Sequence, residues 1–169
     1  MVHSVTKSHM VDESNIVLED EIRGQGVFVN HYRHSLDPKK RLTIPSGWRA
    51  QVGDPKSLYV LPDVRQKCLC VFPAGEMVRR LEKMRRHSIA DDTARRFARV
   101  LGSKSDLVSW DSQGRIRIKD ELLQFAELTE RVTLVGAIDM FELWNPERFE
   151  GLGGMEQEDL GEAAKYVGF

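Results

Sequence analysis

Two short stretches of this chain that are expected to form turns place an aspartate four residues before an arginine: Asp37 with Arg41, and Asp111 with Arg115. An aspartate in a tight turn can accept backbone N–H bonds and hold the turn in one shape. The arginine is then expected to project its guanidinium as a planar fork of donors, which matches guanine O6 and N7 or phosphate oxygens. Because a single pair of this kind is more often an ordinary surface ion pair, the spacing alone is weak evidence of function.

Repetition makes the pattern informative. The two aspartates lie 74 positions apart, and so do the two arginines. Gly114, in the second turn, supplies the positive backbone angle that such a turn can require. Two equivalent basic turns on one body suit a long polyanion with repeated phosphates. The side chains that we expect at a nucleic-acid interface are Arg33, Lys39, Lys40, Arg41, Arg115 and Arg117, with Asp37, Asp111 and Gly114 bracing the loops.

The repeat extends into the elements that must position the turns. Each copy follows the order strand, turn, strand, short helix and two further strands. The expected strands of the first copy cover 32–36, 42–44, 58–61 and 68–72, and Ser46 is expected to cap a helix over 47–52. In the second copy Asp120 is expected to cap a helix over 121–128, followed by strands at 132–135 and 140–144. The predicted fold class is α+β, mainly β.

A different kind of sequence joins the two copies. Met77, Leu81 and Met84 recur at helical spacing, and a second set recurs at i, i+3, i+4 and i+7, namely Ala94, Phe97, Ala98 and Leu101. Asp91 or Asp92 suits the start of the second helix. We therefore expect two amphipathic linker helices with basic outer faces, whose Met and Phe side chains pack into the core rather than line a ligand pocket.

The charge of the chain is unevenly distributed. The formal net charge is −1, but acidic residues dominate 1–26 and 147–169, and basic residues dominate 31–56 and 79–99. A basic interior is compatible with binding phosphates, because lysine and arginine displace the counterions of nucleic acid. Both ends are expected to be mobile extensions. Since we find no apolar run long enough for a membrane helix and no secretory signal, we expect a cytoplasmic protein.

The two cysteines are one residue apart, at Cys68 and Cys70. Alternation along an apolar strand places them on one face together with Phe72. A structural zinc site needs a second pair of ligands, which the sequence does not supply nearby. We expect small buried hydrophobic side chains, with no metal and no cofactor; metal or redox chemistry is the alternative.

The histidines do not make an enzyme site. His31 and His34 are separated by an odd number of positions, so a strand would place them on opposite faces. No other residues form a pattern of nucleophile, base and pocket. We therefore expect no catalysis and no small-molecule substrate, and interpret the two histidines as surface or turn-stabilising residues.

The two motifs resemble the signatures of the MraZ family of transcriptional regulators. The first runs from His34 through Asp37, Lys39 and Arg41 to Pro45, and the second runs from Asp111 to Ile118. The closing strands, Val132 to Val135 and Phe141 to Trp144, also resemble those of the family. The similarity spans about residues 27–150.

This resemblance implies a fold and a function. The family belongs to the AbrB-like swapped-hairpin group, so we expect two tandem repeats, 27–75 and 104–150, that form one pseudo-twofold barrel and are joined by linker helices at 76–103. Residues 1–26 are then an extension and 151–169 an acidic tail. Family members form closed rings and bind short direct repeats in double-stranded DNA upstream of the division and cell wall gene cluster, which includes their own gene. The resemblance implies a nucleoid-associated homo-oligomer in which Arg41 and Arg115 contact DNA.

Two departures and one rival interpretation accompany the resemblance. Lys40 stands where the family usually has glycine, and Lys119 replaces a usual proline. The first turn must therefore adopt another shape or strain Lys40. The alternative function is an AbrB-like antitoxin or protein-interaction module with autoregulatory DNA binding. The acidic tail favours this alternative. Such antitoxins generally carry one hairpin unit, whereas this chain has both halves.

Overall fold

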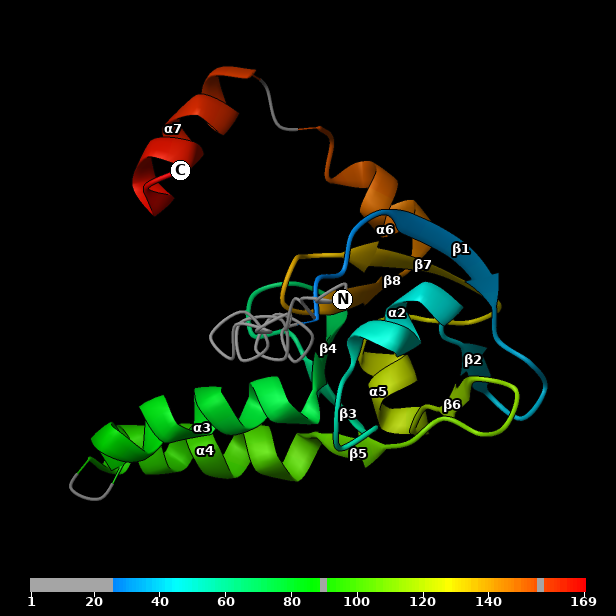
Figure 1. Ribbon diagram of the computed structural model, residues 1–169, viewed down its shortest axis with the longest axis horizontal. Coiled ribbons are helices and arrows are strands. Elements are labelled where there is room, and N and C mark those ends of the chain that lie inside the picture. The colour runs from blue at the N-terminus through cyan, green and yellow to red at the C-terminus, as the bar shows by residue number, and fades with distance from the viewer. Residues whose placement is uncertain (1–25, 89–90, 155–156) are drawn as a thin grey trace, which may run out of the picture.

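The computed structural model describes residues 26–88, 91–154 and 157–169, and shows an α+β protein with mostly antiparallel strands (Figure 1). One sheet has six strands in the order β1-β7-β8-β4-β3-β5, and β2 and β6 form a separate two-stranded ribbon. The strands are β1 (His31–Ser35), β2 (Arg41–Thr43), β3 (Leu58–Pro62), β4 (Cys68–Pro73), β5 (Asp106–Val108), β6 (Arg115–Arg117), β7 (Arg131–Gly136) and β8 (Phe141–Trp144).

Six helices are described. They are α2 (Ser46–Gln51), α3 (Ala74–Ser88), α4 (Asp92–Lys104), α5 (Asp120–Phe125), α6 (Pro146–Gly151) and α7 (Gln157–Val167). Within the described ranges, none has the length and apolar character that crossing a bilayer requires.

The expected hairpin pairs β3–β4 and β7–β8 are confirmed, but the strands that flank each arginine turn pair elsewhere. β1 pairs with β7, and β2 pairs with β6, so the strands of one half pair with strands of the other. The registers are equivalent: His34 lies opposite Val132, and 74 positions later Val108 lies opposite Leu58. The two halves of the chain are therefore interlocked by main-chain hydrogen bonds.

The main core lies between the six-stranded sheet, the ribbon and the two short helices α2 and α5. Leu42 of β2 and Ile116 of β6 are fully buried in it. Phe28, Trp48 and Phe141 form an aromatic cluster, with ring centroids 4.8 to 5.8 Å apart. Burying a large apolar side chain contributes about 1.5–3 kcal/mol, so this core fixes the ribbon rigidly against the sheet.

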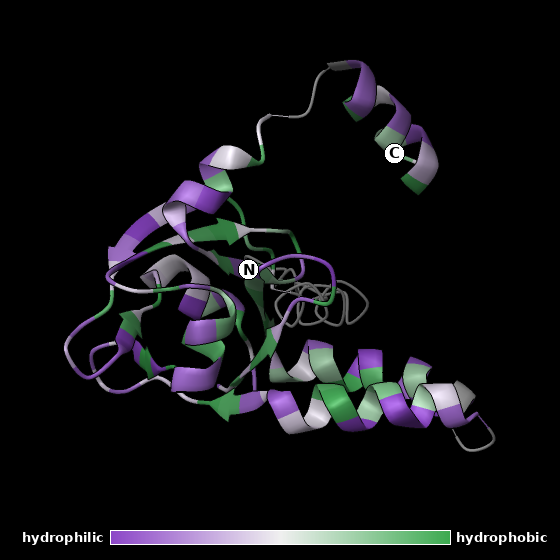
Figure 2. Ribbon diagram, turned by 180° about the vertical axis from the view of Figure 1, so that it is seen from behind, coloured by the Kyte–Doolittle hydropathy of each residue, from purple (hydrophilic) through white to green (hydrophobic). Residues whose placement is uncertain are grey.

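The linker helices leave the body as a hairpin, and Figures 1 and 2 show most of its length extending away from the sheet. Its base is held by a second cluster on the outer face of the sheet, where Met77 packs with Leu61 and Phe72. Phe97, however, is 46% exposed and Val100 is 56% exposed. The expectation that the Met and Phe stripe is core was thus correct for Met77 and wrong for Phe97, because only the sheet end of the hairpin has a surface to pack against.

The helix starts were only partly anticipated. Asp91 caps α4 by accepting N–H bonds from Thr93 and Ala94, as expected. Neither Ser46 nor Asp120 is a cap: each is the first residue of its helix, and the N-cap positions are held by Pro45 and Lys119, which make no side-chain capping bond. The helix expected over 121–128 ends earlier, at Phe125.

The carboxy-terminal region, expected to be an acidic tail, contains a helix. It contains α7, whose apolar side chains are largely exposed, with Leu160 at 52% and Tyr166 at 92%. The expected extension over 1–26 falls almost wholly outside the described residues. The division of the chain into repeats and linker remains a prediction.

Candidate nucleic-acid interface

The first arginine turn is closed by its own aspartate. The backbone N–H of Lys40 donates to the Asp37 carbonyl oxygen over 2.8 Å, and that of Asp37 donates to the Arg41 carbonyl over 3.0 Å. The Asp37 carboxylate holds the other end: Oδ1 accepts the Arg41 backbone N–H at 2.8 Å, and Oδ2 accepts Arg41 Nε at 2.6 Å. The Asp37 carboxylate therefore bonds both the backbone and the side chain of Arg41.

The second turn repeats these bonds. Gly114 N donates to the Asp111 carbonyl over 2.9 Å, and Asp111 N donates to the Arg115 carbonyl over 2.9 Å. Asp111 Oδ1 accepts Arg115 N at 3.0 Å and Gln113 N at 2.9 Å, while Oδ2 accepts Arg115 Nε at 2.9 Å. The two turns are therefore the same device, built twice from local sequence.

Equivalent backbone conformations complete the match. Gly114 has φ 77° and Lys40, its counterpart, has φ 59°. The left-handed region suits glycine and strains other residues. The sequence left open whether the first turn takes another shape or strains Lys40, and the structure shows the strained lysine. At Gly114 a side chain would also collide with a neighbour, because a Cβ there would lie 2.5 Å from Arg49 Cζ.

The ribbon brings the two turns onto one surface. Leu42 pairs with Ile116, and both side chains face the core. Since side chains alternate along a strand, Arg41, Arg115 and Arg117 face the other way. Two cross-bonds fasten the turns to the opposite strands: Ile44 N donates to the Gly114 carbonyl at 2.9 Å, and Ile118 N donates to the Lys40 carbonyl at 3.2 Å.

The arginines project less than the sequence suggested. Each is paired through Nε with the aspartate of its own turn, and the side chains of Arg41 and Arg115 are 30% and 24% exposed. Arg115 is held more tightly, because Nη2 lies 2.8 Å from Asp111 and Nη1 lies 3.9 Å from Asp37. The expectation that the guanidinium groups project freely was wrong. One oxygen of each carboxylate accepts backbone N–H groups, and the second oxygen accepts the arginine side chain.

The bracing carboxylates are strongly stabilised as anions. Hydrogen bonds from the Arg115 side chain and backbone lower the pKa of Asp111 from 3.8 to about 2. At Asp37 partial desolvation raises the pKa, but the hydrogen bonds from the backbone and side chain of Arg41 outweigh it, so the pKa lies below its ordinary value. Both ion pairs are therefore intact at neutral pH.

The remaining basic residues of the expected interface are not all gathered at the ribbon. Lys39 is exposed in the first turn. Lys40 and Arg117 both reach Asp120 at the start of α5, at 3.0 and 3.5 Å. Arg33 is directed elsewhere: its guanidinium lies 2.6 Å from Glu150 of α6.

Two residues of the site were missed by the sequence analysis. Arg49 donates from Nε to the Ile44 carbonyl at 3.1 Å and lies against Gly114, a contact between distant segments that has no local signature. Asp120 anchors Lys40 of the first turn and Arg117 of β6, and Lys40 is the main cause of the lowering of its pKa. Its position three residues after Arg117 at a helix start was a usable signal.

His31 and His34 lie on opposite faces of β1, as their spacing predicted; His31 is exposed and His34 half-buried. The Nδ1 atom of His34 lies 2.7 Å from the carbonyl oxygen of Thr43, so an N–H there joins β1 to the end of β2. This histidine supports the first turn structurally.

These features define an α+β protein that carries two equivalent arginine turns at a two-stranded ribbon. A family described as "MraZ protein, putative antitoxin-like" matches residues 103–165. Relatives named transcriptional regulator MraZ are 32% identical in Clostridium acetobutylicum (73% of this chain, 84% of the relative), 32% in Halothermothrix orenii (82% and 94%) and 31% in Finegoldia magna (73% and 85%). This chain belongs to the MraZ family.

Proposed function

We propose that this chain is a sequence-specific transcriptional regulator that binds short direct repeats in double-stranded DNA through its ribbon face. The observation that carries the proposal is the doubling of a carboxylate-braced arginine turn on one rigid surface. The relatives are named transcriptional regulators, which supports the same class of function. Its target is the promoter of the division and cell wall gene cluster, including its own gene.

The braces suit this role despite the limited exposure of the arginines. A guanidinium held through Nε loses little rotational freedom on binding, so less entropy opposes the contact. Asp37 holds Arg41 through Nε, and we infer that the terminal amino groups of Arg41 form the fork that contacts guanine or phosphate. Lys39, Lys40, Arg115 and Arg117 add charge on either side, and Arg33 belongs to the periphery.

The proposed architecture is two tandem AbrB-like repeats, 27–75 and 104–150, that form one pseudo-twofold barrel, with linker helices at 76–103. The equivalence of the β1–β7 and β5–β3 registers at an offset of 74 supports it. α2 and α5 support it too, since their bounds are related by the same offset. In this arrangement a pseudo-twofold axis passes between β2 and β6, and relates the two arginine turns.

We also propose that copies assemble into a closed ring on nucleoid DNA in the cytoplasm, without catalytic activity. An apolar groove of about 790 Å³ between α4, α5 and the β3–β4 turn supports an interface with a second copy. Phe97 and Val100 line it although about half of each side chain is exposed. A ring presents the ribbon repeatedly, as a series of direct DNA repeats requires.

The test is a gel-shift titration with the DNA immediately upstream of the chain's own gene. Arg41→Ala and Arg115→Ala are each expected to weaken binding by about 1–3 kcal/mol where the contact is to a base edge. A phosphate contact would instead weaken binding to all sequences and reduce the salt dependence. Arg148→Ala is the matched control, because this exposed arginine pairs with Glu127 away from the ribbon. Unchanged affinity in both ribbon variants would refute the assignment.

The second candidate function is that of an antitoxin-like protein that binds a protein partner, in line with the words of the family description. The exposed apolar side chains of α7, next to the acidic residues Glu158, Asp159 and Glu162, favour a bound protein partner. A small basic protein that co-purifies stoichiometrically with the intact chain, and is lost when residues 157–169 are removed, would favour this alternative.

A further inference from the structure

The cysteine pair acquires a third neighbour in the folded chain. Cys68 and Cys70 point from the same face of β4, and the β3–β4 turn brings Asp63 against them. The two Sγ atoms and a carboxylate oxygen all lie within 4.8 Å of one another. We propose that Asp63, Cys68 and Cys70 form a binding site for one Zn²⁺ ion, a role that the sequence analysis did not expect because the spacing of the cysteines offered no further ligand.

The separation of Cys70 and Asp63 suits a shared zinc ion. Cys70 Sγ lies 3.3 Å from Asp63 Oδ2. In a tetrahedral site with Zn–S of about 2.3 Å and Zn–O of about 2.1 Å, a sulfur and an oxygen ligand are roughly 3.6 Å apart. Two thiolates select a soft or borderline cation such as Zn²⁺ over Mg²⁺ or Ca²⁺. The set leaves the fourth position to a water molecule.

The carboxylate is already oriented for the role. Asp63 Oδ1 accepts the backbone N–H groups of Arg65 and Gln66, both at 2.7 Å, and the Asp63 N–H donates to the Cys68 carbonyl at 3.0 Å. These bonds lock the turn and direct Oδ2 toward the sulfur atoms, as the bonds around a metal ligand commonly do.

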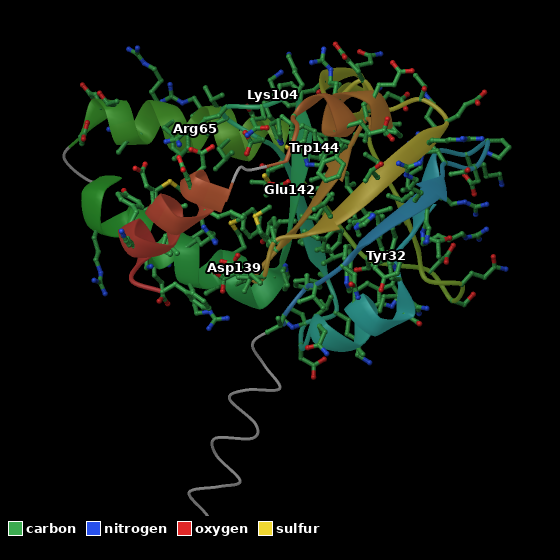
Figure 3. All side chains as sticks on the ribbon, turned by 90° about the horizontal axis from the view of Figure 1, so that it is seen from above. Tyr32, Arg65, Lys104, Asp139, Glu142 and Trp144 are labelled. Atoms are coloured by element: carbon green, nitrogen blue, oxygen red, sulfur yellow. The ribbon has the colours of Figure 1, made fainter. Side chains whose placement is uncertain are left out.

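The surroundings allow an ion to enter. Cys68 and Cys70 are 1% and 9% exposed, but Asp63 is half-buried and lines the groove beside α4. Figure 3 shows Glu142 and Trp144 on β8, the strand next to the cysteines. Glu142 lies opposite Cys70, but its carboxylate accepts the indole N–H of Trp144 at 2.7 Å and is not one of the three clustered groups.

Binding is an exchange of protons for metal. Each thiol releases its proton to solvent as an S–Zn bond forms, and Asp63 contributes an electron pair from its oxygen, with no oxidation or reduction. The hydrogen bond with Cys68, burial and the neighbouring Asp63 all raise the pKa of Cys70, so that it is a thiol before the metal arrives. The bound ion would tie the β3–β4 turn to β4 at the edge of the groove.

Cobalt titration of the reduced full-length chain tests the site. Because the chain has only two cysteines, a sulfur-to-cobalt charge-transfer band must come from Cys68 or Cys70, and Co²⁺ held by histidines such as His3 or His9 gives none. We expect this band to saturate at one Co²⁺ per chain, with the visible bands of tetrahedral cobalt, and to disappear when Zn²⁺ is added. Absence of the band in folded protein, or saturation at one ion per two chains, would overturn the proposal.

Variants then assign the ligands. Cys70→Ser is expected to abolish the band, and Asp63→Asn to weaken binding by more than about tenfold while its amide oxygen still accepts the turn N–H groups. Glu142→Gln is the matched control, since it removes an adjacent carboxylate but keeps an acceptor for Trp144, and it should bind Co²⁺ as the unaltered chain does. Unchanged affinity in Asp63→Asn would remove that residue from the site. Circular dichroism of each variant separates lost binding from lost folding, and the wild-type titration decides the proposal even if a variant does not fold.

Discussion

Lys40 holds a backbone conformation that its equivalent, Gly114, adopts without strain. Holding a non-glycine residue in the left-handed backbone region costs about 1–3 kcal/mol of conformational strain. Lys40→Gly is therefore expected to raise the free energy of unfolding by about 1 kcal/mol, because relief of strain exceeds the loss of an exposed ion pair with Asp120. Urea denaturation measures the change.

Two further variants show whether the backbone is responsible. Lys40→Ala also removes the ion pair but keeps the strained conformation, and should not be stabilising. Gly114→Ala is expected to cost at least about 1 kcal/mol, because it adds strain and displaces Arg49 from its bond with the Ile44 carbonyl. A Lys40→Gly chain that is less stable than the wild type would contradict the explanation.

Asp111 gives the turn a pH dependence with a definite sign. Its pKa falls from 3.8 to about 2 in the folded chain, so the anion is favoured by folding. The stability that it contributes is complete above about pH 4 and is lost as the pH falls toward about 2. In Asp111→Asn this contribution is absent, so the stability difference from the wild type should shrink over that window.

Denaturation curves at intervals from pH 5 to pH 2 check this expectation. Asp92→Asn serves as the control, because this exposed carboxylate at the start of α4 lies outside both turns. A difference between wild type and Asp111→Asn that stays constant down to pH 2 would rule out the aspartate as the titrating brace.

At this scale the sequence predicted what is local. The backbone bonds to Asp37 and Asp111 follow from residues within four positions, and both were anticipated. The contact of Arg49 with Gly114, and the arrival of Asp63 beside Cys70, join segments whose proximity depends on the whole fold. No periodicity or spacing indicates such contacts.

At the scale of elements, patterns identified strands better than their partners. Alternation along 31–35 and 41–43 fixes which side chains face the core, but it does not say which strand lies alongside. The partners lie in the other half of the chain, since β1 pairs with β7 and β2 with β6. The short helices were found, but their caps were not, because Pro45 and Lys119 precede them in extended conformations and leave Ser46 and Asp120 inside the helices.

In the linker helices, the apolar stripe is longer than the surface that covers it. Ala94, Phe97, Ala98 and Leu101 form an apolar stripe, and a stripe predicts burial without naming the surface that provides it. Leu101 meets the sheet cluster, while Phe97 and Val100 lie farther out in the groove. The exposed part of the stripe is the strongest reason to expect another copy of the chain there.

At the scale of the whole molecule, the distribution of charge matters more than its sum. A net charge of −1 gives no general attraction to DNA, so affinity must come from local surfaces such as the ribbon face. One braced ribbon offers few phosphate contacts, and each contact contributes little at physiological salt. Under the proposed function, tight binding to a series of repeats requires several ribbons held together, and assembly would then be part of recognition.

This dependence gives a prediction that links the groove to DNA. Phe97→Glu places a charge in the apolar groove on α4 and should disrupt assembly, because a buried unpaired carboxylate is costly. Phe97 is already 46% exposed and lies on α4, outside the ribbon, so the isolated chain should remain folded. Light scattering is expected to show a smaller species, and gel shifts a loss of affinity of at least about tenfold for DNA with several repeats but little change for one repeat. Arg86→Glu, on the exposed surface of α3, lowers the charge of the linker hairpin by two units where Phe97→Glu lowers it by one, and so controls for added negative charge. If Phe97→Glu still assembles, the groove is not the interface; if it is monomeric yet binds several repeats as tightly as the wild type, assembly does not contribute to recognition.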